Sequence, residues 1–165
     1  MTLTIQDFKQ TMAQWASGVT VVTTCAEDGS LKGMTASSFS SLSIDPLLIL
    51  ICVGKKLYSH QVLIQNGVFA INILSEQQKY WGELFAGMYP DIEDRFAVTG
   101  FQTEVTGSPI LPNVLGWLDC KIQQTHDAGD HTIFIGEVLA AGHNSGALPL
   151  TYFNRQWGTF KGLNT

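Results

Sequence analysis

Charged side chains are scarce in this sequence. They make up 14% of its 165 residues, whereas a typical soluble domain contains about 25%. A surface so poor in charge is usually partly covered by another subunit, so we expect a homodimer. The net charge is −5 at pH 7, and Lys55-Lys56 is the single adjacent basic pair. Because domains that bind nucleic acid carry clustered Lys and Arg, we expect no nucleic-acid partner.

Long apolar runs are missing as well. The longest, Leu47 to Val53, is far shorter than the roughly 20 residues that span a bilayer. No N-terminal stretch shows the charged and then apolar layout of a secretory signal. We therefore expect a soluble, cytoplasmic protein without a membrane partner.

The residue patterns of several common sites are absent. Cys25, Cys52 and Cys120 form no C-x-x-C pair and no disulfide framework. The four histidines lack zinc-ligand spacing, so no metal site is expected. There is no G-x-G-x-x-G after a strand, no phosphate-binding G-x-x-x-x-G-K-[ST] and no G-x-S-x-G elbow. A nucleotide would have to bind outside a Rossmann fold, and a nucleophilic serine is disfavoured.

The elements that are present predict one domain, residues 1–165, built mainly of strands. Thr4 to Asp7 resembles a capping box, and Ile5, Phe8, Met12 and Trp15 recur at helical spacing up to Gly18. We expect this helix to lie on the core by one face.

Short β-branched or apolar segments predict the strands, and turn residues separate them. The predicted strands are 19–25, 47–53, 68–74, 117–125 and 132–140, with a hairpin turn at 27–30. Further helices are predicted from Ser59, as N-cap, to Asn66, and after a second capping box at 75–78. Because no long βαβ alternation appears, an antiparallel sheet or barrel is favoured over a Rossmann fold.

The most informative stretch is Gly33 to Leu47. Six hydroxyl-bearing residues lie within nine positions, from Thr35 to Ser43, and the apolar segment follows them. Such small polar side chains at the rim of a core predict a surface for a flat polar ligand. A solvated Ser/Thr-rich loop is the alternative.

An anion site is predicted where the helix near Ser59 begins. A helix N-terminus offers unpaired N–H groups and a partial positive charge, and Lys55 lies just before it. The alternative is an ordinary capped surface helix with solvated lysines.

Several blocks, in order, resemble the short-chain NAD(P)H:flavin oxidoreductase family, the reductase components of two-component flavin monooxygenases. They are the Ser-rich stretch, Phe69 to Leu74, Leu84 to Gly87, Arg95-Phe96, Ala128 to His131, and Tyr152 to Arg155. The resemblance implies an FMN-binding split β-barrel, antiparallel with Greek-key topology, and a few peripheral helices.

The resemblance also implies a set of site residues. His131 is the candidate catalytic residue, beside the flavin where the nicotinamide stacks, although a solvated turn histidine is the alternative. The candidate cofactor-binding residues are Thr35, Ala36, Ser37, Ser38, Ser40 and Ser41 for the ring, Cys52, Val53 and Gly54 along the ligand, Lys55 and Ser59 for the phosphate, Phe85, Ala86, Gly87 and Arg95 as a second wall, and Tyr152 and Arg155 toward the pyridine nucleotide.

The implied function is a reductase that passes hydride from NADH or NADPH to FMN or FAD. Reduced flavin would then leave to serve a separate monooxygenase. The alternatives are an FMN-holding electron-transfer protein, as flavoredoxin-like relatives are, and a non-catalytic FMN-binding domain. Trp157 replaces the smaller or tyrosine-like aromatic residues common at its position in the family.

Overall fold

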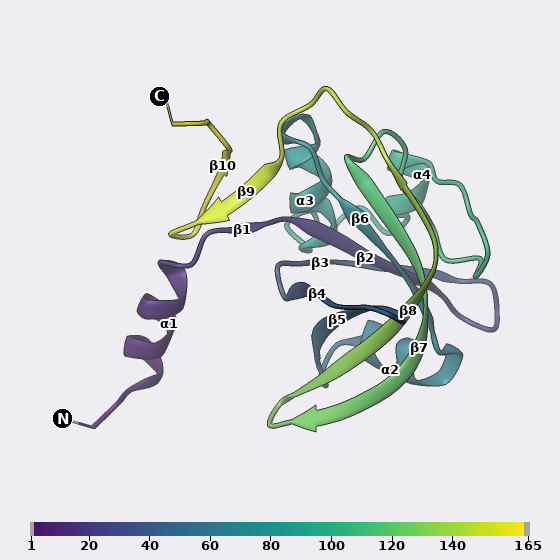
Figure 1. Cartoon of the computed structure of the whole chain (residues 1–165), viewed down its shortest axis with the longest axis horizontal. Helices are drawn as coiled ribbons and strands as arrows, with labels where there is room; N and C mark the ends of the chain where they lie inside the picture. The colour runs from purple at the N-terminus through teal and green to yellow at the C-terminus, as the bar shows by residue number, and fades with distance from the viewer. Residues whose placement is uncertain (1, 164–165) are drawn as a thin grey trace.

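A computed structural model describes residues 2–163, in which antiparallel strands form two sheets. The larger sheet has the order β3-β2-β6-β7-β8-β5-β4 and the smaller has the order β1-β9-β10 (Figure 1). The strands of the larger sheet are β2 (Thr20–Cys25), β3 (Leu31–Ala36), β4 (Phe39–Ile44), β5 (Leu47–Gly54), β6 (Val68–Ile73), β7 (Gly116–Ala128) and β8 (His131–His143). Those of the smaller sheet are β1 (Ser17–Gly18), β9 (Leu150–Phe153) and β10 (Gln156–Thr159).

The predicted fold class, mainly β with antiparallel pairing, is confirmed. Strands β3 and β4 follow each other in the chain, yet they lie at opposite edges of the larger sheet. The sheet is therefore not a closed barrel, and its form agrees with the expected split barrel. The helices are α1 (Ile5–Ala13), α2 (Tyr58–Asn66), the 3₁₀ helix η1 (Glu76–Gln78), α3 (Lys79–Phe85) and α4 (Arg95–Thr99).

Turn residues with specific hydrogen bonds and backbone angles form the hairpins of the larger sheet. Between β2 and β3, the Ser30 N–H donates to the Asp28 carboxylate at 2.8 Å, and Gly29 adopts a φ of +81°. Strands β7 and β8 are joined by Gly129 and Asp130, with Gly129 at φ +60°. This loop is short enough to let both strands run longer than predicted, to 13 residues each.

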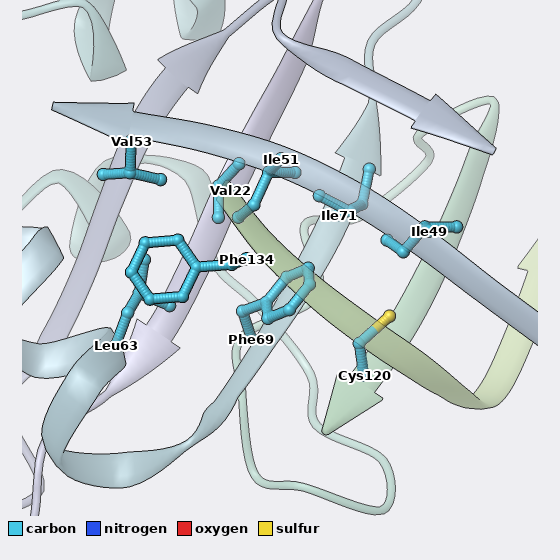
Figure 2. Packing of buried hydrophobic residues seen from close by; sticks show 9 residues of the cluster. All are labelled: Val22, Ile49, Ile51, Val53, Leu63, Phe69, Ile71, Cys120 and Phe134. Carbon is cyan, nitrogen blue, oxygen red and sulfur yellow. The ribbon is translucent and has the colours of Figure 1, made fainter. Parts of the chain in front are cut away.

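One core cluster lies against the larger sheet and α2 (Figure 2). Its buried members are Val22, Ile49, Ile51, Val53, Leu63, Phe69, Ile71, Cys120 and Phe134. Burial raises the pKa of the Cys120 thiol to about 12, so this cysteine packs in the core as a neutral thiol. A second cluster joins β2, α3, α4 and β9 through Val21, Leu74, Phe85, Phe96 and Leu150, among others.

Helix α1 corrects one expectation. The capping box at Thr4 and Asp7 is present, but the helix ends at Ala13 and none of its residues is buried. Ile5, Phe8, Met12 and Trp15 are 76%, 60%, 51% and 73% exposed. The helix stands away from the larger sheet (Figure 1), and its end meets the β9–β10 turn, where the Asn154 N–H donates to the carbonyl of Ala13 at 2.8 Å. The apolar spacing correctly predicted a helix with an apolar side, but the core of this chain does not cover that side.

Candidate functional site

A groove of about 770 Å³ lies over β3, between the start of α2 and the end of α3. This is within the usual range of ligand pockets, roughly 300 to 1,000 Å³. We call it the β3 groove. It is lined by Gly29, Leu31, Lys32, Gly33, Met34, Leu57, Tyr58, Ser59, Phe85, Ala86, Gly87, Glu93, Asp94, Arg95 and Phe96. Five predicted site residues are therefore brought together here: Ser59, Phe85, Ala86, Gly87 and Arg95.

The floor of the groove depends on Gly33. A Cβ at this position would lie 2.6 Å from a ring carbon of Phe85, so only glycine lets β3 lie directly on that ring. Phe85 is 2% exposed and packs on Phe96 with ring centroids 5.2 Å apart. Phe85 thus supports the groove from beneath.

Two cations stand at the groove. The guanidinium of Arg95 approaches Gly87, with Nη2 4.0 Å from the position of a Cβ there, and Gly87 has a φ of +81°. The Lys32 ammonium lies 5.1 Å from the centroid of the Tyr58 ring, within cation–π range. Of the two lining carboxylates, Asp94 accepts a hydrogen bond from the Ala97 N–H at 2.9 Å as the cap of α4. Cations beside aromatic and apolar surface suit a ring that carries an anionic group.

The prediction that Ser59 is an N-cap is wrong. Leu57 is the N-cap residue of α2, and no side chain caps the helix. Ser59 lies inside the first turn and its hydroxyl is turned toward β3, where it lies 3.3 Å from the sulfur of Met34. The uncapped first turn of α2 borders the groove, as the predicted anion site requires.

The Ser-rich segment lies at the two sheet edges, on β3, on β4 and in the link between them. Three of its hydroxyls donate to backbone carbonyls: Thr35 to Gly82 at 2.6 Å, Ser38 to Cys52 at 2.8 Å, and Ser40 to Ser41 at 3.0 Å. The carbonyl of Ala36 accepts from Thr20 at 2.8 Å. A ligand would therefore meet acceptor lone pairs and edge-strand backbone groups here.

The end of β5 brings Gly54 beside His131. The two residues are cross-strand partners, and a Cβ on Gly54 would lie 3.7 Å from Nε2 of His131. His131 bonds through Nδ1 to the Asp130 carboxylate at 2.8 Å, and this bond lowers the pKa of Asp130. Val53 is 1% exposed, so the predicted contact of this residue with a ligand is not supported. The Lys55 ammonium pairs with Asp127 at 3.1 Å.

A second hollow, of about 680 Å³, separates α1 from the turn between β9 and β10. We call it the α1 hollow. Four predicted residues line it, namely Ser37, Ser38, Tyr152 and Arg155, together with Phe8 and Met12 of the helix and Trp15 just after it. Tyr152 packs edge-on against Trp157 at 5.2 Å, which gives that unusual tryptophan a structural contact. Nine of the eighteen predicted site residues thus line the two hollows, five in the groove and four here, and the other nine, including His131, line neither.

Sequence reasoning missed Lys32, Met34 and Tyr58 in the groove. Lys32 directly precedes the stretch Gly33 to Leu47, so extending that stretch by one residue would have found it. Met34 lies within the stretch but was not named as a site residue. The Lys32 and Tyr58 pair joins two separate elements, and no local signal indicates it.

Membrane-spanning helices and metal-binding groups are both absent from residues 2–163. No helix in this part of the chain has the length and apolar character needed to cross a membrane. Within the same residues, no group of three or more His, Cys, Asp or Glu side chains is arranged to hold a metal ion.

The fold and the groove define a class, an open antiparallel β protein with a cleft suited to a flat ligand carrying an anionic group. The volume and the two cations fit a flavin phosphate and ring. The chain belongs to the family described as flavin reductase like domain, whose model matches residues 12–161. The resemblance noted in the sequence is confirmed.

Individual relatives agree with this assignment. A probable flavin reductase of Rhizobium meliloti (strain 1021) is 43% identical over 84% of this chain and 43% of its own length. The reductase component of a flavin-dependent trigonelline monooxygenase from Acinetobacter baylyi is 40% identical over 81% of this chain and 42% of its own. The chain thus spans less than half the length of these two relatives.

A solved structure shows the same fold. The NADH:FAD oxidoreductase SgcE6 of Streptomyces globisporus, in complex with NAD and FAD fragments, has a TM-score of 0.87 and 32% identity. The match covers 94% of this chain and 92% of that one.

Proposed function

We propose that this chain is an NAD(P)H-dependent flavin reductase that supplies reduced FMN or FAD to a separate monooxygenase. The main observation that supports this proposal is the β3 groove. It brings Arg95, Lys32 and the uncapped start of α2 together in a member of the flavin reductase family. The bound nicotinamide and flavin supply the hydride chemistry, and the protein binds and orients them.

Each group of residues has a proposed task. Ser59 and Arg95 bind the flavin phosphate, and the edges of β3 and β4 from Thr35 to Ser41 bind the ring. His131, beside Gly54, orients the nicotinamide. Holding two reactants in the right geometry can account for a large part of a rate enhancement, so the proposal needs no general acid or base.

Steady-state NADH oxidation with added free FMN tests the proposal. We expect many turnovers per protein molecule, with flavin behaving as a substrate, and no turnover in a protein-free control. An absorption spectrum of the purified protein shows whether flavin is retained. Retained FMN without NADH oxidation would favour the electron-transfer or non-catalytic alternative. Repeating the assay with NADPH and FAD establishes the preferred pair.

A homodimer is part of the proposal, together with one domain over residues 1–165 and a cytoplasmic location. The apolar side of α1 supports the dimer, because Ile5, Phe8 and Met12 of the helix and Trp15 just after it are exposed. Closed two-fold dimers are also the commonest oligomers. Light scattering at micromolar concentration tests the dimer, and cell fractionation tests the location.

The monooxygenase partner can be tested separately. Two-component systems are named among the relatives, including the trigonelline monooxygenase of Acinetobacter baylyi. We expect this chain with NADH and free flavin to support a flavin-dependent monooxygenase that is supplied without its own reductase. Failure with active enzyme and adequate flavin would reject the supply role.

A further inference from the structure

Lys55 is held by the β7–β8 turn at both its backbone and its side chain. Its N–H donates to the carbonyl of Asp130 at 3.0 Å, and its ammonium lies 3.1 Å from the carboxylate of Asp127. Two residues later the chain reaches Leu57, which lines the β3 groove. The ammonium is thus engaged at the turn while the neighbouring backbone forms the groove.

Asp127 is itself anchored from the interior. The Thr132 hydroxyl donates to the other oxygen of the Asp127 carboxylate at 2.8 Å, and Thr132 is only 2% exposed. Because its proton is used there, this hydroxyl accepts from His60, whose Nε2 lies 2.9 Å away. The network therefore assigns the proton to Nε2 of His60. The His60 ring packs edge-on against Phe134 with centroids 5.4 Å apart.

This series of hydrogen bonds holds the Asp127 carboxylate in position. It runs from α2 through β8 to β7 and ends on the flexible side chain of Lys55. The hydrogen bond from Thr132 and the contact with Lys55 lower the pKa of Asp127, so the carboxylate is charged at neutral pH. Lysine carries its charge on a four-carbon stem and can turn to another anion.

We propose that Asp127 is a specificity-determining residue that holds the Lys55 ammonium away from the β3 groove, so that a flavin phosphate must compete with Asp127 for it. The inference rests on the proposed function, because it assumes that the phosphate lies at the start of α2. Its consequence is that Asp127 weakens the hold on phosphorylated flavins and leaves riboflavin unaffected. A weaker hold suits a flavin that must leave after reduction.

The test is titration of Asp127→Asn with FMN and with riboflavin at low ionic strength. An exposed ion pair contributes little, so we expect FMN to bind roughly two- to fivefold more tightly and riboflavin to bind as before. Glu137→Gln is the matched control. It removes one charge from the same hairpin, where Glu137 accepts from Gln123 at 2.9 Å and does not bond Lys55. We expect no change in that variant.

The Lys55→Met variant shows whether the effect of Asp127→Asn on FMN binding depends on Lys55. Lys55→Met should weaken FMN binding more than riboflavin binding, and adding Asp127→Asn should then change nothing. Unchanged or weaker FMN binding by Asp127→Asn would overturn the inference, as would equal tightening in the Lys55→Met background. Neither of those results would count against the proposed flavin reductase function. Absence of flavin binding by the unmodified protein would instead reject the proposed function, and this inference with it.

Discussion

The β3 groove and the α1 hollow each collect predicted site residues, but they are built differently. The groove rests on side chains buried in the chain's own core, with Phe85 and Phe96 at 2% and 7% exposed. One wall of the α1 hollow is a helix without any buried residue. We therefore expect one chain to complete the groove, and a second surface, that of the proposed dimer partner, to cover α1 beside the hollow. We expect substitutions in the two places to act on different properties.

Phe8→Glu should have the largest effect of these substitutions, because it tests the proposed dimer contact through α1. Phe8 is 60% exposed, so folding should tolerate the change. A charge at the centre of a dimer contact should raise the dimer dissociation constant on the order of 100-fold, as for a strong interface hot spot. Sedimentation over a concentration series measures it. Gln10→Glu, which adds the same charge elsewhere on α1 and removes no apolar contact, should remain dimeric; if both variants behave alike, α1 is not the contact.

Gly33→Ala should damage the groove and leave the oligomeric state alone. The new Cβ would lie 2.6 Å from the buried ring of Phe85, which has little room to withdraw. Overpacking of this kind costs about 1 to 3 kcal/mol of unfolding free energy. Urea denaturation measures the loss, and FMN affinity should fall with it. The matched control is Gly18→Ala, because no atom lies within 4 Å of a Cβ there; equal stability of the two variants would contradict the packing argument.

His131→Ala tests whether the β7–β8 turn acts on the nicotinamide. The residue lies in neither hollow but stands beside Gly54 at the end of β5. Since misplaced reactants lose rate steeply, we expect reduction of bound FMN by NADH to slow roughly tenfold, with FMN affinity within a few-fold. Stopped-flow absorbance follows the reduction. His126→Ala, which removes an exposed histidine of the same hairpin, should retain the original rate. An unchanged rate and NADH dependence in His131→Ala would leave it as a turn residue.

The sheet was predictable because its signals are local. Val21 and Val22 on a β-branched strand, followed by Asp28 and Gly29 in a turn, specify a hairpin within a few positions. The environment of α1 was not predictable, because periodicity identifies an apolar side and says nothing about which molecule covers it.

The site shows the same division. The Ser-rich stretch was identified from its own closely spaced hydroxyl residues, and the family resemblance implied Arg95, which does line the groove. The ion pair of Lys55 with Asp127 depends on how β5, β7 and β8 align, which only the folded sheet defines. Spacing suggested Ser59 as a cap, but the packing of α2 against β3 turned its hydroxyl toward Met34.

The double substitution Ser38→Ala with Ser40→Ala should have the smallest effect of these variants, a small loss of FMN affinity. Both hydroxyls already donate to backbone carbonyls, at 2.8 and 3.0 Å, so a flavin can use only their acceptor lone pairs. We expect a combined loss of about 1 kcal/mol in FMN binding, close to the value of one hydrogen bond, with the fold retained.

Ser38 lines the α1 hollow, so a loss of flavin affinity would connect that hollow to the flavin site. Fluorescence titration with FMN measures the change, and Ser43→Ala on the same strand is the control. Affinity equal to that of the control would remove the hydroxyls of the Ser-rich segment from the ring site and leave the edge-strand backbone as its contact.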